Sequence, residues 1–222
     1  MTSKTIDVEA LKSVLLHRKI MKERFNLPMS LIQAEQYLLA SIMAEVEYRH
    51  RKFISTNALH EQISKTAKFL TKNDDKFCLF LCGGCGNGKT TMMKAIQNLI
   101  NMLNIYDSYS RSTFGFQIFD AKNLVSISQN SYDQWQSLCR SRMLAIDDVG
   151  TEPAEVLHFG NAITPITDLL SIRYDEQLFT IVSSNLTPSQ VRQKYGERIA
   201  DRLNEMAKTV VFQNVSYRNQ FE

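Results

Sequence analysis

A glycine-rich segment followed by a lysine and a threonine contains the residue types that bind a nucleotide phosphate chain. Gly83, four further residues and then Gly88, Lys89 and Thr90 match the pattern G-x-x-x-x-G-K-[ST]. In this pattern backbone N–H groups and a helix N-terminus surround the phosphates, because glycine lets the backbone approach them closely. Lys89 would contact the β- and γ-phosphates, and the Thr90 hydroxyl would bind the Mg²⁺ that bridges them. We therefore expect ATP and Mg²⁺ to be bound by the loop Gly83, Gly84, Cys85, Gly86, Asn87, Gly88, Lys89, Thr90 and Thr91.

Two adjacent carboxylates follow an apolar run farther along the chain. Met143 to Ile146 is uncharged, and Asp147 and Asp148 come directly after it. Ligands of open parallel sheets bind at the carboxyl ends of the strands, where these two side chains would lie. We expect Asp147 to hold Mg²⁺ and Asp148 to polarise the attacking water. The alternative is a solvated strand end with a turn at Gly150.

A third polar group follows the next apolar strand. Ser183, Ser184 and Asn185 come immediately after Ile181 and Val182. Such a sequence is by itself typical of an ordinary turn. Beside a phosphate loop, Asn185 is instead expected to orient the attacking water or to contact the γ-phosphate.

Arginines near the C-terminus have two interpretations. Arg198 and Arg202 are four residues apart and neighbour Glu197 and Asp201, so surface ion pairs would explain them. An arginine finger, supplied to the site of a neighbouring subunit, is the other interpretation. Arg218, after the last predicted strand, is a third candidate for contact with the nucleotide.

The elements that must position these groups alternate between strands and helices. After the phosphate-loop helix, strands are predicted at Gly115–Phe119, Met143–Ile146, Phe179–Ser183 and Thr209–Phe212, and helices at Ala121–Ile127, Asp133–Leu138, Ala162–Tyr174 and Glu197–Met206. This alternation predicts an α/β fold with a mostly parallel sheet flanked by helices. Residues 1–70 are predicted to be an all-helical, partner-binding prefix, with a capping box at Ser30 and Gln33, and residues 71–222 to be the nucleotide-binding domain.

Composition sets the cellular context that we expect. The 222 residues are 44% hydrophobic and 22% charged, and no apolar segment is long enough to span a membrane. The four cysteines and the polar start predict a cytoplasmic protein with reduced thiols. Cys78, Cys82 and Cys85 have the spacing of an iron–sulfur site, but Cys85 lies inside the phosphate loop, which cannot wrap both a cluster and a triphosphate.

Basic residues are concentrated before the phosphate loop. Residues 1–70 hold 11 lysines and arginines against 7 aspartates and glutamates, although the whole chain has a net charge of only +3. The runs His17-Arg18-Lys19 and Arg49-His50-Arg51-Lys52 could contact DNA phosphates or an acidic partner. The more common role of such runs is a solvated helix face.

Five landmarks occur together in an order that resembles the DnaC/IstB group of AAA+ ATPases. They are Gly83–Thr91, Leu144–Gly150, Arg173–Tyr174 before Thr180–Leu186, Gly196–Leu203 and Ser216–Arg218. The resemblance implies an AAA+ fold with Lys89 and Thr90 as the Walker A pair, Asp147 and Asp148 as the Walker B pair, Asn185 as sensor 1, Arg202 as the finger and Arg218 as a sensor-2-like arginine. Many members have Glu where this chain has Asp148, which suggests slow hydrolysis.

The resemblance also implies partners. We expect a slow ATPase that forms a homo-oligomer in the ATP state, binds DNA, expected to be single-stranded, and loads a replicative helicase. An IstB-like helper that assists a transposase is the alternative within the group. A small P-loop kinase or nucleotide-binding module is the alternative of another class, and it would be monomeric and have no DNA role.

Overall fold

The chain folds around a parallel sheet. The computed structural model describes residues 7–17, 24–72, 75–107, 111–214 and 216–217. Within these residues the main sheet has five strands in the order β4-β5-β8-β1-β9, and every neighbouring pair is parallel. The predicted α/β class with a parallel sheet is therefore confirmed. The strands are β4 (Ile118–Asp120), β5 (Met143–Val149), β8 (Phe179–Ser184), β1 (Cys78–Gly83) and β9 (Ala207–Phe212).

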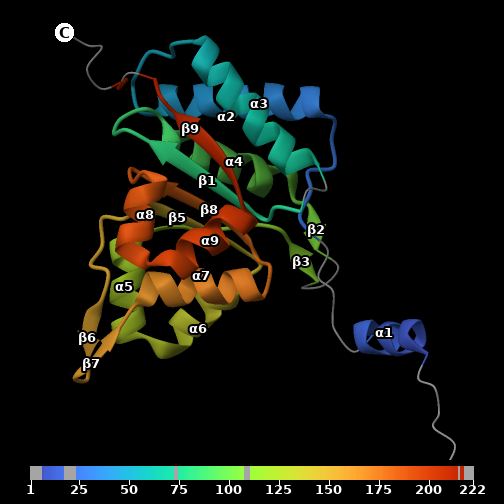
Figure 1. The fold of residues 1–222 in the computed structure, drawn as a ribbon. Coiled ribbons are helices and arrows are strands. Elements are labelled where there is room, and N and C mark those ends of the chain that lie inside the picture. The colour runs from blue at the N-terminus through green and yellow to red at the C-terminus, as the bar shows by residue number, and fades with distance from the viewer. Residues whose placement is uncertain (1–6, 18–23, 73–74, 108–110, 215, 218–222) are drawn as a thin grey trace, which may run out of the picture.

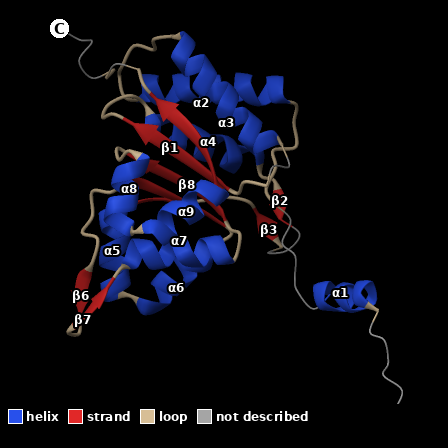
Figure 2. Ribbon diagram, viewed as in Figure 1, coloured by secondary structure: helices blue, strands red, loops and turns tan. Residues whose placement is uncertain are grey.

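Helices cover both faces of this sheet, so the molecule has three layers (Figures 1 and 2). One face packs against α2 (Leu31–Tyr48), α3 (Asn57–Thr71) and α4 (Lys89–Leu103). The other face packs against α5 (Ala121–Asn130), α6 (Tyr132–Arg140), α7 (Pro165–Asp175), α8 (Pro188–Tyr195) and α9 (Glu197–Met206). Burial on both faces explains why the central strands appear in the sequence as continuous apolar runs.

Helix starts follow the sequence signals. The Ser30 hydroxyl oxygen accepts a hydrogen bond from the Gln33 N–H, and the Gln33 side-chain oxygen accepts one from the Ser30 N–H, so the predicted capping box of α2 is confirmed. Thr187 and Gln190 form the same arrangement at α8. Such reciprocal bonds satisfy backbone N–H groups that the first helical turn cannot pair.

The predicted helix Ala162–Tyr174 is wrong at its start. Asn161–Ile163 is strand β7, which pairs with β6 (Val156–His158) as an antiparallel hairpin. The two turn residues, Phe159 and Gly160, have φ angles of 48° and 82°, as a tight hairpin turn requires. Pro165 then begins α7, because proline suits the first helical turn.

Two further differences concern short strands. The strand predicted at Gly115–Phe119 begins only at Ile118. A second antiparallel pair, β2 (Tyr106–Asp107) with β3 (Ser112–Thr113), was not predicted, because two-residue strands leave no periodic pattern.

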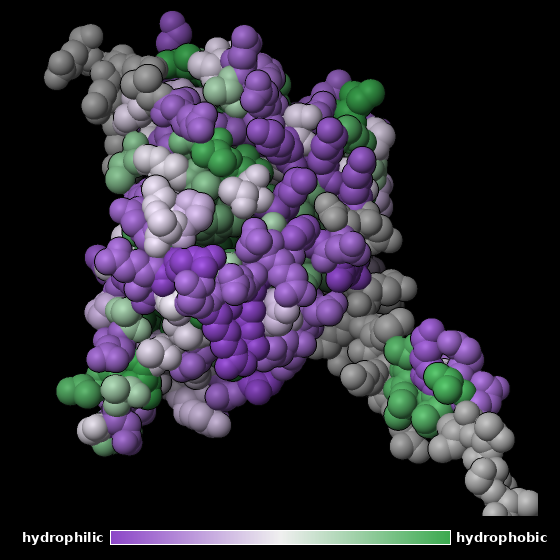
Figure 3. Space-filling model, viewed as in Figure 1, coloured by the Kyte–Doolittle hydropathy of each residue, from purple (hydrophilic) through white to green (hydrophobic). Residues whose placement is uncertain are grey.

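The N-terminal helices differ in their packing. Helix α1 (Val8–His17) has no buried residue, and its apolar side chains are exposed on the surface (Figure 3). Leu157 and Phe159 of the β6–β7 hairpin are exposed as well. By contrast, Ala34, Leu38 and Ile42 of α2 are buried in the same core as α4. That residues 1–70 form a separate partner-binding unit stays a prediction. Among the described helices, none is both long and apolar enough to cross a membrane.

Candidate functional site

The phosphate loop connects β1 to α4, and its glycines are required by the backbone. Gly83, Gly86 and Gly88 have φ angles of 144°, 75° and 99°, which residues with a Cβ rarely adopt. A Cβ on Gly83 would lie 2.1 Å from the carbonyl oxygen of Phe212. The loop can therefore lie against β9 only if residue 83 is glycine.

Side chains from the loop and from the segment after β9 hold these two parts together. Asn87 Nδ2 donates a 2.6 Å hydrogen bond to the Phe212 carbonyl oxygen, and Asn214 Nδ2 donates one of 3.1 Å to the Asn87 carbonyl oxygen. The Tyr217 N–H donates to the carbonyl oxygen of Gly86 at 3.0 Å. Asn87, expected from the sequence to contact the nucleotide, is thus a buried side chain that fixes the shape of the loop.

Lys89 lies at the centre of the loop. Its Nζ donates hydrogen bonds to the carbonyl oxygens of Gly83 at 2.9 Å and Gly84 at 2.7 Å, and to Asn185 Oδ1 at 2.7 Å. Burial lowers the pKa of Lys89 below its ordinary value, while the charges of Asp148 and Asp147 favour the ammonium form. The structure therefore brings together the lysine of the loop and the asparagine that follows β8.

Thr90 and the first carboxylate also meet. The Thr90 hydroxyl donates to Asp147 Oδ1 at 3.2 Å, across 57 positions of the sequence. The two side chains come from the first turn of α4 and the end of β5, and β8 lies beside β5 in the sheet. Hydroxyl and carboxylate oxygens are the ligands that Mg²⁺ takes from proteins, so this donor set fits the metal that the sequence implies.

Ser183 of β8 is a residue that the sequence analysis did not assign to the site. The Ser183 hydroxyl donates a hydrogen bond to the Asp147 carboxylate. The Ser183 Oγ atom in turn accepts a 2.9 Å hydrogen bond from the Asp148 N–H. The pairing of β5 with β8 shifts by one residue here, between Ile146 and Val149. Ser183 therefore supports a β-bulge that turns Asp148, with a φ of 55°, toward the phosphate loop.

The turn after the carboxylates is fixed to α8. Glu152 is buried; it accepts a 2.8 Å hydrogen bond from the Gly150 N–H and another from the Tyr195 hydroxyl. Lys194 Nζ donates to the Gly150 carbonyl oxygen at 2.7 Å. Burial and the hydrogen bond to Glu152 raise the pKa of Tyr195, so this phenol stays protonated as a donor.

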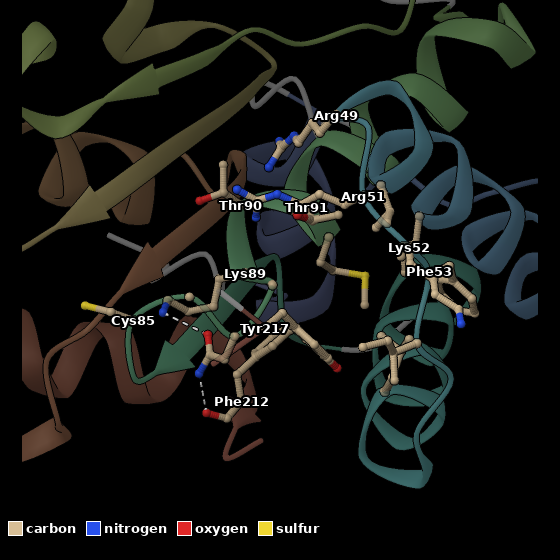
Figure 4. Close-up of a pocket in the computed structure, with 18 of the residues that line it drawn as sticks. Arg49, Arg51, Lys52, Phe53, Cys85, Lys89, Thr90, Thr91, Phe212 and Tyr217 are labelled. Atoms are coloured by element: carbon tan, nitrogen blue, oxygen red, sulfur yellow. Dashed lines mark hydrogen bonds between the residues drawn. The ribbon is translucent and has the colours of Figure 1, made fainter. Parts of the chain in front are cut away.

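A cavity of about 220 Å³ opens beside the phosphate loop (Figure 4). The loop, Asp148, Asn185, Phe212 and Tyr217 form part of its wall. The remaining wall comes from α2, α3 and the segment between them, and includes apolar and basic residues: Ile42, Val46, Arg49, Arg51, Lys52, Phe53, Ile54 and Leu59. From the sequence, the basic run at residues 49–52 is expected to contact DNA, an acidic partner or solvent. In the structure, Arg49, Arg51 and Lys52 of this run lie at the candidate nucleotide site.

The arginines of α9 lie away from this cavity and differ in their contacts. Arg202 Nη2 donates to Asp175 Oδ1 at 3.1 Å, and the guanidinium lies 4.7 Å from the centre of the Tyr174 ring. Arg198 is exposed, and within the described part of the chain its side chain has no hydrogen bond or ion pair. Arg218, the third candidate, lies outside the described residues.

The cysteines do not meet as a metal site. Cys78 and Cys82 are buried, whereas Cys85 is exposed in the phosphate loop. Burial raises the pKa of the Cys78 thiol to about 12, so it stays protonated. Among the described residues, no group of three His, Cys, Asp or Glu side chains is arranged to hold a metal.

Comparison with known proteins identifies structural neighbours. No family model and no curated protein matches the sequence. The crystal structure of the DnaC helicase loader matches with a TM-score of 0.58 and 17% identity, over 81% of this chain and 100% of that one. DnaI matches with a TM-score of 0.56 and 18% identity, over 86% and 95% of the two chains.

A replication initiator is a further neighbour. DnaA bound to AMPPCP and single-stranded DNA matches with a TM-score of 0.50 and 16% identity, over 73% of this chain and 49% of that one. The sequence resemblance to DnaC is therefore confirmed at the level of the fold: this chain has the P-loop NTPase fold of the DnaC and DnaI structures.

Proposed function

We propose that this protein is an AAA+ ATPase that binds ATP with Mg²⁺ and acts with a partner on DNA during replication. The proposal rests on one observation: residues at the carboxyl ends of the neighbouring strands β5, β8 and β1 lie close together. Lys89 follows β1, Asp147 lies near the carboxyl end of β5 and Asn185 follows β8. Lys89 bonds to Asn185, and Thr90 bonds to Asp147. Residues that bind phosphate, hold a metal and orient water thereby share one site.

The roles divide between binding and turnover. Lys89 would bind the β- and γ-phosphates when it releases the carbonyl oxygens of the loop, and Thr90 with Asp147 would hold Mg²⁺. When bound, the metal would neutralise charge on the phosphate oxygens. Asp148 accepts hydrogen bonds from the attacking water and polarises it, and Asn185 orients that water or the γ-phosphate. Arg202, or the exposed Arg198, stabilises the developing charge in the site of a neighbouring subunit.

The partner proposal rests on the structural neighbours. Loading of a replicative helicase is favoured, because one neighbour is described as a helicase loader and a DnaA neighbour is bound to single-stranded DNA. A transposition helper remains the alternative within the group. A monomeric kinase or nucleotide-binding module is the alternative of another class, for which no arginine finger is needed.

The test has two parts. The full chain should bind ATP in a calorimetric titration, Mg²⁺ should strengthen binding, and Lys89→Ala should abolish it. Affinity purification from the native host with ATP and Mg²⁺, followed by mass spectrometry, should yield a replicative helicase, and the purified pair should bind each other directly. ATP binding unchanged by Lys89→Ala would refute the nucleotide site, and recovery of a transposase instead would favour the helper function.

A further inference from the structure

The segment between α2 and α3 brings a second set of cations to the phosphate loop. Arg49, Arg51 and Lys52 line the same cavity as Lys89 and Thr90. Arg51 and Lys52 are exposed, whereas Arg49 is partly buried, with 32% of its side chain accessible. Arg49 is therefore the cation of this run whose position is defined by packing.

The backbone around Arg49 is fixed by the end of α2. The His50 N–H donates to the Glu47 carbonyl oxygen at 2.8 Å, and the Arg51 N–H donates to the Val46 carbonyl oxygen at 3.2 Å. These are the two hydrogen bonds of a Schellman motif. His50 occupies its left-handed position with a φ of 54°, where glycine is usual. The chain thus turns sharply after Arg49, and the turn places the segment that follows along the cavity.

A carboxylate from α2 joins the Arg49 side chain to α4. Glu45 Oε2 lies 3.7 Å from Arg49 Nη2, and only 14% of the Glu45 side chain is accessible. Asn98 Nδ2 of α4 donates a 2.7 Å hydrogen bond to Glu45 Oε1. Arg49 lines the same cavity as Thr90 and Thr91 of the first turn of α4 (Figure 4). Arg49 is therefore held at the cavity that would receive the phosphates.

The guanidinium keeps most of its bonding capacity. It has five N–H donors, and within the described part of the chain the ion pair with Glu45 is its only polar contact. A guanidinium can bind two oxygens of one phosphate through two parallel N–H donors in a fixed planar arrangement, a geometry that an ammonium lacks. Lys89, by comparison, is already bonded to carbonyl oxygens and to Asn185. Arg49 therefore has side-chain N–H groups that are free of contacts with the described residues and could donate hydrogen bonds to a triphosphate in this cavity.

We propose that Arg49, the residue that caps the C-terminus of α2, binds the terminal phosphates of the nucleotide in its own subunit. This inference rests on the proposed function and extends the site to a helix that precedes the phosphate loop. Through Glu45 and Asn98, occupation of the site would also fix α2 against α4, so phosphate binding and the packing of the N-terminal helices are coupled.

The test measures the affinity of Arg49→Ala for ATP and for AMP. ATP carries the terminal phosphates and AMP does not, so the Kd for ATP should rise about tenfold while that for AMP stays within threefold. Arg49→Lys keeps the charge without the two-pronged geometry and should lie between Arg49→Ala and the parent. Lys94→Ala is the matched control, because it removes a cation from α4 that does not line the cavity, and its Kd values should not change.

Four outcomes of these measurements are informative. The inference is overturned if the Kd of Arg49→Ala for ATP rises less than threefold. If Lys89→Ala at the same time fails to bind ATP, the proposed function remains intact. Equal loss for ATP and AMP also overturns it, because it shows damage to the cavity as a whole. ATP binding by Lys89→Ala overturns the proposed function itself. If Arg49→Ala does not fold, Arg49→Lys and Glu45→Gln must each weaken ATP binding at least threefold, or the inference fails.

Discussion

Lys89 Nζ lies 2.7 Å from Asn185 Oδ1, although the two residues are 96 positions apart in the sequence. The contact exists because β8 lies next to β1 in the sheet, so the residue that follows β8 arrives beside the phosphate loop. The side chain that would bind phosphate and the one that would sense it are therefore in direct contact. This relationship leads to the first prediction.

We expect Asn185→Ala to lower the turnover of ATP on the order of 10²-fold while the Kd for ATP changes little. The asparagine would act on the attacking water and the γ-phosphate, whereas Lys89 keeps its other contacts in the loop. Steady-state hydrolysis and calorimetric binding measure the two quantities. A loss of binding equal to the loss of turnover would show that Asn185 only positions Lys89.

Asp148→Asn should bind ATP as tightly as the parent and hydrolyse it at least about 10²-fold more slowly, because an amide cannot polarise water as a carboxylate does. Asparagine is the appropriate replacement, since it tolerates the φ of 55° at this position nearly as well as aspartate. Parental turnover by Asp148→Asn would remove the proposed role of Asp148.

The sequence predicts these chemical groups because each one interrupts an apolar run. Asp147 and Asn185 both follow uncharged strands, and parallel strands carry such residues to a common edge. This reasoning does not predict the role of Ser183. Its role depends on a one-residue shift in the pairing of β5 with β8, and a pairing shift between segments that are distant in sequence leaves no local pattern. The position of Arg49 at the cavity could not be predicted either, because the charge of a residue does not show which way the end of its helix faces.

The fold was predictable to a similar extent. The buried strands β5 and β8 begin where the sequence predicts them, at Met143 and Phe179, because burial in the sheet requires apolar runs. The predicted helix begins three residues too early, at Ala162 instead of Pro165, because apolar residues of a short hairpin continue into the apolar face of α7. Phe159 does not identify the hairpin turn in the sequence, because a turn residue with a positive φ is normally Gly, Asn or Asp.

Gly83→Ala should lower the free energy of unfolding by about 2 kcal/mol or more and weaken ATP binding, because its Cβ would lie 2.1 Å from the Phe212 carbonyl oxygen. Gly84→Ala is the matched control in the same loop, where the nearest atom is 3.9 Å from the added Cβ. Denaturant unfolding of both variants measures the difference. Equal stability of the two would mean that the contact between the loop and β9 is not rigid.

In the native protein a thiol reagent should modify Cys85 rapidly and the other cysteines slowly. Cys78 and Cys139 are buried, and burial raises the pKa of their thiols to about 12 and about 11, so little thiolate forms at neutral pH. ATP with Mg²⁺ should slow the modification of Cys85, because that residue lines the cavity. Mass spectrometry of digested protein identifies the modified positions. Iron-dependent absorbance in the purified protein would instead support the iron–sulfur interpretation.

The last prediction concerns assembly and separates the two arginines of α9. Arg202 is only 15% accessible and is paired with Asp175, so Arg202→Ala should lower the free energy of unfolding by about 1 kcal/mol. Arg198→Ala should leave stability unchanged, because the side chain is exposed. Both variants are expected to bind ATP, since neither residue lines the cavity.

Mixing then identifies the finger. If Arg202 completes the site of a neighbouring subunit, Arg202→Ala should hydrolyse ATP slowly, and adding Asp148→Asn protein should restore part of the turnover. In the mixture an intact Asp148 on one subunit meets an intact Arg202 on the other, which a finger acting within its own chain could never achieve. The same experiment with Arg198→Ala is the comparison. Rescue of Arg198→Ala alone would transfer the role to Arg198. Failure of both mixtures, with a monomeric mass in ATP and DNA, would refute the assembly and favour a monomeric kinase-like protein.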